Sequence, residues 1–76
     1  MQLTIGRRLK KDVESLEEAS RIYGELRDQS GEGASTFPDG RIRDGKTTYR
    51  ISYNGKVWIT ARALVFDPYK TLEVQS

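Results

Sequence analysis

The sequence predicts a single small α+β domain over residues 1–76, with one amphipathic helix packed on a mainly antiparallel sheet of about three to five strands. Three features lead to this prediction. One stretch has apolar residues at helical spacing, several short stretches alternate apolar and polar residues, and Asp-Gly and Asn-Gly pairs separate the alternating stretches. The expected order is β-α-β-β-β, and residues 72–74 are a candidate for a final short strand.

A strand and the helix come first. Leu3 and Ile5 alternate with polar residues, which predicts a short strand running towards Leu9. The run SLEE at residues 15–18 has the capping-box pattern, so the helix should begin there, and the run SGEG at residues 30–33 should end it. The apolar stripe of this helix has spacings of three and four residues and consists of Val13, Leu16, Ala19, Ile22, Tyr23 and Leu26.

A loop and a meander of strands follow the helix. Residues 31–40 are rich in glycine and other turn formers, and Phe37 is the expected anchor of this loop to the core. Asp44-Gly45 and Asn54-Gly55 each predict a turn between antiparallel strands. Asp67-Pro68 breaks the apolar segment that comes after the second hairpin.

The Asn54-Gly55 turn fits two registers that differ by one residue, and the choice decides which side chains share a face. A two-residue loop mixes apolar and charged residues on both faces and buries Trp58. A three-residue loop with Gly55 left-handed pairs Ile51 with Val57 and gathers the apolar residues on one face. We favour the three-residue loop, because a half-buried sheet separates apolar from polar side chains, although two-residue loops are commoner at Asn-Gly.

In the favoured register Tyr49 faces Ile59 across a hairpin whose second strand covers residues 56–63. The expected core then combines the helix stripe, the first strand, the loop anchor and the hairpin. It consists of Leu3, Ile5, Leu16, Ala19, Ile22, Tyr23, Leu26, Phe37, Tyr49, Ile51, Val57, Ile59 and Ala61.

The charges are distributed unevenly. The net charge is +2, but residues 11–28 hold six acidic against three basic residues, whereas residues 41–62 hold six basic residues against one acidic residue. In the favoured register the outward face of the hairpin carries Arg50 opposite Trp58. Cations neutralise phosphates and an indole offers a stacking surface, so this face suits DNA or RNA. The candidate nucleic-acid-binding residues are Lys46, Arg50, Lys56, Trp58 and Arg62.

The structural alternative for this face is an ordinary solvated surface on which Arg50 stacks on Trp58 as a cross-strand cation–π pair. The hairpin sequence GKTTYRISYNGKVWITARA, residues 45–63, also resembles the strand pairs of small sheet-based DNA-binding domains, such as the arm-site-binding domains of phage-type integrases. In those domains the helix follows the sheet, whereas here it precedes the hairpin. The resemblance therefore concerns the type of surface, and no residue roles are transferred.

The chain has no histidine and no cysteine, which excludes a thiol nucleophile, an imidazole base, a Cys/His zinc site and a disulfide. We therefore expect a protein that is not an enzyme and uses no cofactor or metal. The run GRIRDGKT at residues 40–47 matches the pattern of a phosphate-binding loop. That loop must open a helix, whereas residues 48–53 alternate as a strand, so the run is interpreted as a hairpin turn.

A protein-interaction or accessory role is the alternative function, with docking through the acidic helix face or an exposed sheet edge. The modest net charge of +2 favours this alternative. No apolar run approaches the roughly 18 residues of a membrane span, and the first residues lack the apolar stretch of a signal peptide, so a cytoplasmic protein without membrane contact is expected. The sequence leaves the partner and the oligomeric state open.

Overall fold

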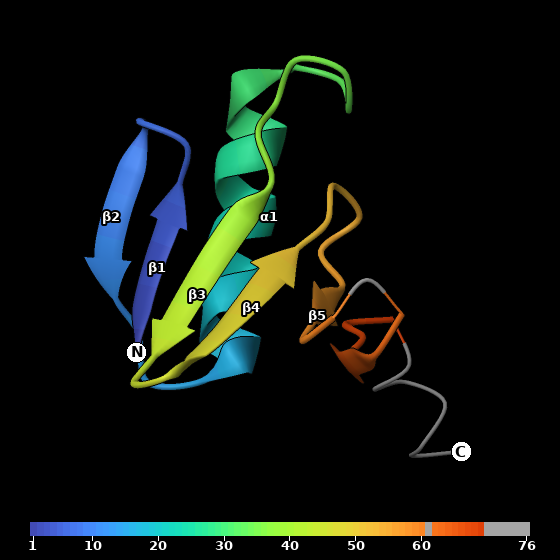
Figure 1. Ribbon diagram of the computed structural model, residues 1–76. Coiled ribbons are helices and arrows are strands. Elements are labelled where there is room, and N and C mark those ends of the chain that lie inside the picture. Colours follow the sequence, from blue (N-terminus) through green and yellow to red (C-terminus); the bar gives the residue numbers. More distant parts are fainter. Residues whose placement is uncertain (61, 70–76) are drawn as a thin grey trace.

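The computed structural model describes residues 1–60 and 62–69. In this part of the chain one helix covers one face of a six-stranded antiparallel sheet (Figure 1), which confirms the predicted α+β class. The elements are β1 (Gln2–Ile5), β2 (Leu9–Asp12), α1 (Leu16–Ser30), β3 (Gly40–Asp44), β4 (Thr47–Ile51), β5 (Val57–Trp58) and β6 (Leu64–Phe66). The strand order in the sheet is β2-β1-β3-β4-β5-β6, so α1 carries the chain from one edge strand back to the middle. The candidate final strand at residues 72–74 lies outside the described residues.

Two strands precede the helix, where the sequence indicated one. The chain turns at residues 6–8, so that Leu9 returns opposite Ile5 and the amide of Arg8 donates to the Ile5 carbonyl at 2.9 Å. Gly6 begins this turn with a φ of +53°, and a Cβ at this position would lie 2.9 Å from the Pro38 ring. The prediction missed this hairpin because the loop Gly-Arg-Arg contains none of the residue pairs, such as Asn-Gly or Asp-Gly, that usually mark a hairpin turn.

The predicted helix ends are confirmed. Ser15 is extended and its hydroxyl accepts from the amide of Glu18 at 3.0 Å. The Glu18 carboxylate reaches one residue further back than expected and accepts from the amide of Glu14 at 2.7 Å. At the other end Gly31 takes the left-handed conformation, with a φ of +70°, that favours glycine after a helix.

The three-residue loop after β4 is also confirmed. Ile51 pairs with Val57, the amide of Ser52 donates to the Lys56 carbonyl at 3.0 Å, and Gly55 has a φ of +88°. Apolar residues therefore share the face that packs on α1, as the favoured register required.

The second strand of this hairpin is shorter than predicted. β5 ends at Trp58, and the chain then turns back so that the amide of Ile59 donates to the Ala63 carbonyl at 2.9 Å and β6 pairs with β5. Ile59 is 42% exposed, so its prediction as a core residue is wrong. Its expected pairing with Tyr49 does not form, because β4 pairs with β5 at two positions only within the described chain. The predicted core residue Ala61 lies outside the described residues.

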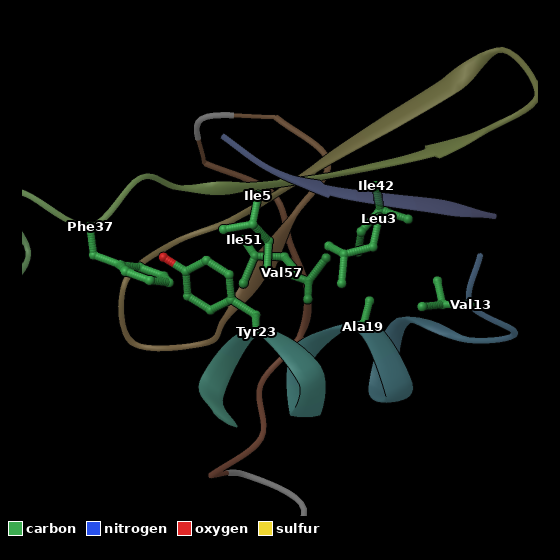
Figure 2. Packing of buried hydrophobic residues seen from close by; sticks show 9 residues of the cluster. All are labelled: Leu3, Ile5, Val13, Ala19, Tyr23, Phe37, Ile42, Ile51 and Val57. Carbon is green, nitrogen blue, oxygen red and sulfur yellow. The ribbon is translucent and has the colours of Figure 1, made fainter. Parts of the chain in front are cut away.

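The core lies between α1 and the inner face of the sheet, which is the face that contacts the helix (Figure 2). The list of expected core residues omitted Ile42, which is flanked by two arginines, and Val13, which was assigned to the helix stripe but precedes the helix. Among the residues predicted for the core, Leu16, Ile22, Leu26 and Tyr49 are half-buried against it. The buried residues are Leu3, Ile5, Val13, Ala19, Tyr23, Phe37, Ile42, Ile51 and Val57.

Aromatic residues fix the loop after α1, as expected for Phe37, which is buried against Tyr23 with ring centroids 5.4 Å apart. The Tyr23 hydroxyl donates to the Pro38 carbonyl at 3.0 Å, and burial, followed by the nearby charge of Asp39, raises the pKa of Tyr23 to about 12. The Tyr53 hydroxyl donates to the backbone carbonyl of Glu32 at 2.7 Å. The loop is therefore held near both ends, by Tyr53 at Glu32 and by Tyr23 at Pro38.

Candidate nucleic-acid interface

The face of the sheet that points away from α1, here called the outer face, carries a row of side chains at right angles to the strands. The pairing register sets Lys10 beside Thr4, Thr4 beside Arg41, Arg41 opposite Arg50, and Arg50 opposite Trp58. These five residues come from five neighbouring strands, and we call them the outer row. In Figure 1 this face is turned towards the viewer, with α1 behind the sheet.

The outer row lies in a shallow groove with a volume of about 770 Å³. A second, parallel row adds Gln2, Arg43 and Thr48 to its lining, as the register of β1, β3 and β4 requires. Among the described residues that line the groove, four are cations and one, Asp39, is a carboxylate. The groove therefore combines positive charge with hydroxyl and amide groups that can donate hydrogen bonds to an anion.

Arg50 has two partners within the groove. Its guanidinium nitrogen Nη1 lies 3.3 Å from Oδ2 of Asp39, and its Cζ lies 5.9 Å from the centroid of the Trp58 ring. The side chains of Arg50 and Asp39 are 46% and 51% exposed, so solvent screens their ion pair. The cation–π contact that the sequence analysis considered as the structural alternative is thus present, and it leaves both charged side chains open to solvent.

The indole of Trp58 is positioned by the loop that follows β4. Its Nε1–H donates to the Ser52 hydroxyl at 3.1 Å, and that hydroxyl donates in turn to Oδ1 of Asn54 at 2.6 Å. The same Asn54 oxygen accepts from the backbone amide of Lys56 at 3.2 Å. Trp58 is half-buried and lines the groove, so the hydrogen-bonded edge of the indole is fixed while part of the ring remains accessible.

The structure brings two of the five predicted site residues into the groove, namely Arg50 and Trp58. Lys46 is exposed in the turn between β3 and β4, and Arg62 is exposed in the turn between β5 and β6. Lys56 is half-buried, and its Nζ lies 3.8 Å from Oδ2 of Asp67, whose side chain is 9% exposed. These three cations therefore lie outside the lining of the groove.

Sequence reasoning missed three groove cations, Lys10, Arg41 and Arg43. Lys10 was missed because β2 was not predicted. The two arginines flank the buried Ile42, and this short alternation is the signal that marks them as outward-facing once β3 is placed inside the sheet. The Asp44-Gly45 turn predicts the pairing of β3 with β4, whereas the pairing of β3 with β1 joins segments far apart in the chain and has no local signal.

Two kinds of feature are absent from the described residues. No group of three or more acidic side chains among residues 1–60 and 62–69 is arranged to hold a metal ion. In the same part of the chain, α1 is neither long nor apolar enough to cross a membrane. Comparisons with protein-family models, curated proteins and solved structures gave no significant match.

Proposed function

We propose that this protein is a small, non-enzymatic nucleic-acid-binding module and that the outer face of its sheet is the contact surface. The observation that carries the proposal is the concentration of four cations and one tryptophan in a single groove. Positive grooves neutralise phosphates, and aromatic side chains next to them stack with bases. Lys46 and Arg62, which are exposed in the β3–β4 and β5–β6 turns, extend the positive charge beyond the groove, and Lys56 contributes to the extent that it leaves Asp67.

Electrostatic repulsion between two arginines of the outer row also supports a binding role. Arg41 and Arg50 lie directly opposite each other on neighbouring strands. Like charges in this position destabilise a sheet by repulsion. An exposed sheet face that served stability alone would favour opposite charges or hydroxyl residues at these positions, whereas an anionic ligand turns the repulsion into attraction.

The experiment is a titration of the intrinsic Trp58 fluorescence with short DNA and RNA at low and moderate salt. A groove variant, Lys10→Gln/Arg41→Gln/Arg43→Gln, keeps both Trp58 and Arg50. The matched control, Arg7→Gln/Lys11→Gln/Arg21→Gln, removes three exposed cations that do not line the groove. Both variants lose the same net charge, so the comparison separates a binding site from overall charge.

We expect saturable fluorescence changes for the native protein that weaken steeply with salt. The groove variant should bind much more weakly. The magnitude of its slope of log K against log salt concentration should be smaller by roughly two to three, because each lost phosphate contact removes about 0.7–0.9 from this slope. The control should bind nearly as the native protein does. Equal losses in the two variants, or no binding at all, would reject the outer face as a nucleic-acid site.

The alternative is docking of another protein at β6, which is an edge strand of the sheet formed by the described residues. Leu64 and Val65 in this strand are 38% and 43% exposed, and edge strands offer unpaired backbone groups to a partner strand. This function predicts a flat fluorescence titration and a complex that persists at high salt. Sedimentation of the protein alone detects the simplest case, which is pairing of two copies.

A further inference from the structure

We propose that the ligand of the groove is a single-stranded nucleic acid that crosses the sheet at right angles to its strands and places one base against Trp58. This inference rests on the proposed function and specifies its substrate class. It follows from the direction of the outer row, from the position of α1 and from the contacts of Arg50.

The outer row defines a path of fixed length whose two ends differ chemically. Neighbouring strands are about 4.8 Å apart, so the four strand-to-strand steps from Lys10 to Trp58 span roughly 19 Å. The cations occupy the path from Lys10 to Arg50, and the indole lies at its end, beside Arg50. Such a path suits a short run of nucleotides whose phosphates meet the cations while a base reaches the aromatic ring.

A duplex does not match this surface. Inside a duplex the base faces are covered by their neighbours, so an indole beside the backbone meets no free base face. Readers of the major groove insert a projecting helix or a two-stranded ribbon, whereas the outer face is concave and α1 lies on the opposite side of the sheet. The exposed side of α1 also carries Glu17 and Glu25, whose charges repel phosphate.

The contacts of Arg50 show how the ligand can replace partners within the protein. In the free protein its guanidinium contacts both the Asp39 carboxylate and the Trp58 ring. A phosphate replaces the carboxylate as the ion partner of Arg50, and a base then takes the place of the guanidinium on the indole. Both contacts are open to solvent, so the exchange requires no change in the core.

The test measures the anisotropy of labelled ten-nucleotide strands and of the matching blunt duplexes, in DNA and RNA versions, with single strand and duplex compared at each of several salt concentrations. We expect single strands of the version that binds to be preferred by about tenfold or more. A fully abasic strand of the same length, in which all bases are removed while every phosphate stays, should bind about tenfold more weakly than the normal strand. All bases are removed because the strand can shift along the row and replace a single missing base.

Variants assign this preference to the groove. Trp58→Ala should abolish most of the preference for single strands with little change in salt dependence, and Trp58→Phe should restore part of it. Arg41→Gln should lower the salt dependence while keeping the preference. Asp39→Asn should tighten single-strand binding up to about fivefold, because it removes the carboxylate that competes for Arg50.

The inference fails if the duplex binds as tightly as the single strand, or if the fully abasic strand binds as tightly as the normal one. Salt-dependent binding in that case still supports the proposed function. If neither form binds with a dependence on salt, both the inference and the proposed function fail. The fully abasic strand keeps the test valid even if the Trp58 variants do not fold.

Discussion

The inner and outer faces of the sheet are built from alternate residues of the same strands, yet different forces select them. Ile51 on the inner face is fully buried against the helix side, whereas its neighbour Arg50 on the outer face is half-exposed. Burial of apolar surface stabilises the inner face, so its residues are constrained by volume and shape. The outer face is free of that constraint, and under the proposed function its row of cations serves ligand binding.

The largest expected difference between the faces comes from truncating two neighbouring residues of β4. Ile51→Ala should lower the free energy of unfolding by about 2–5 kcal/mol, because it leaves a cavity in the core. Arg50→Ala should change it by no more than about 1 kcal/mol, because its ion pair is exposed. Urea unfolding followed by circular dichroism measures both, and comparable losses would contradict the division between the faces.

A glycine on the inner face gives a second test. A Cβ at Gly40 would lie 3.0 Å from Cδ1 of Tyr23 and 3.2 Å from Cβ of Ile51, so Gly40→Ala should cost about 1–3 kcal/mol through overpacking. The matched control is Gly33→Ala in the loop after α1, where a Cβ meets no atom within 4 Å and the backbone φ is not positive. Denaturation midpoints should separate the two variants, and equal midpoints would show that the packing around Gly40 is loose.

The hydroxyl of Tyr23 gives the inner face a dependence on alkaline pH. The pKa of Tyr23 is raised to about 12 in the folded protein, so the folded state holds this proton more tightly than the unfolded state does. The resulting stabilisation is fully present below about pH 10 and is lost as the pH rises towards 12. Tyr23→Phe should cost about 1 kcal/mol at neutral pH by removing the hydrogen bond to Pro38.

Thermal unfolding of the native protein and of Tyr23→Phe between pH 8 and pH 11 checks this expectation. The stability difference between the two proteins should shrink as the pH rises above about 10. A difference that stays constant over this range would mean that Tyr23 does not titrate as the buried environment requires.

The smallest expected effect on stability has the opposite sign and lies on the outer face. Arg41→Thr removes the repulsion with Arg50 and should stabilise the protein by about 0.2–1 kcal/mol. The same substitution should weaken nucleic-acid binding several-fold. Arg43→Thr is the matched control, because Arg43 lies beside Gln2 and Thr48 and has no like-charged neighbour in either pairing. Arg43→Thr should therefore weaken binding without the same gain in stability. Equal gains in stability for the two variants would show that repulsion between Arg41 and Arg50 is not the cause.

The two faces also differ in how far the sequence predicts them. Alternation and the need for one apolar face identified Ile51 and Val57 as partners, and the capping pattern located the start of α1. Ile59 was mispredicted because alternation continues past Trp58, whereas the chain turns back to form β6.

The outer row was predicted only where a single hairpin defines it, at Arg50 and Trp58. Lys10 belongs to the β1–β2 hairpin, which the sequence reasoning missed, and Arg41 belongs to the β3–β4 hairpin, where it lies opposite Arg50. The long-range pairing of β1 with β3 then joins the two hairpins into one row. Local patterns of residues do not contain that information, because each strand taken alone presents an isolated cation.

The most direct test of the account is an NMR titration of isotope-labelled protein with a short single-stranded oligonucleotide. The indole Nε1–H of Trp58 and the amides of Thr4, Arg41 and Arg50 should shift together and saturate at one stoichiometry. The backbone amide signals of Glu17 and Glu25 in α1 should not shift. Shifts concentrated on α1, or no shifts at low salt, would contradict the assignment of the outer face as the binding surface.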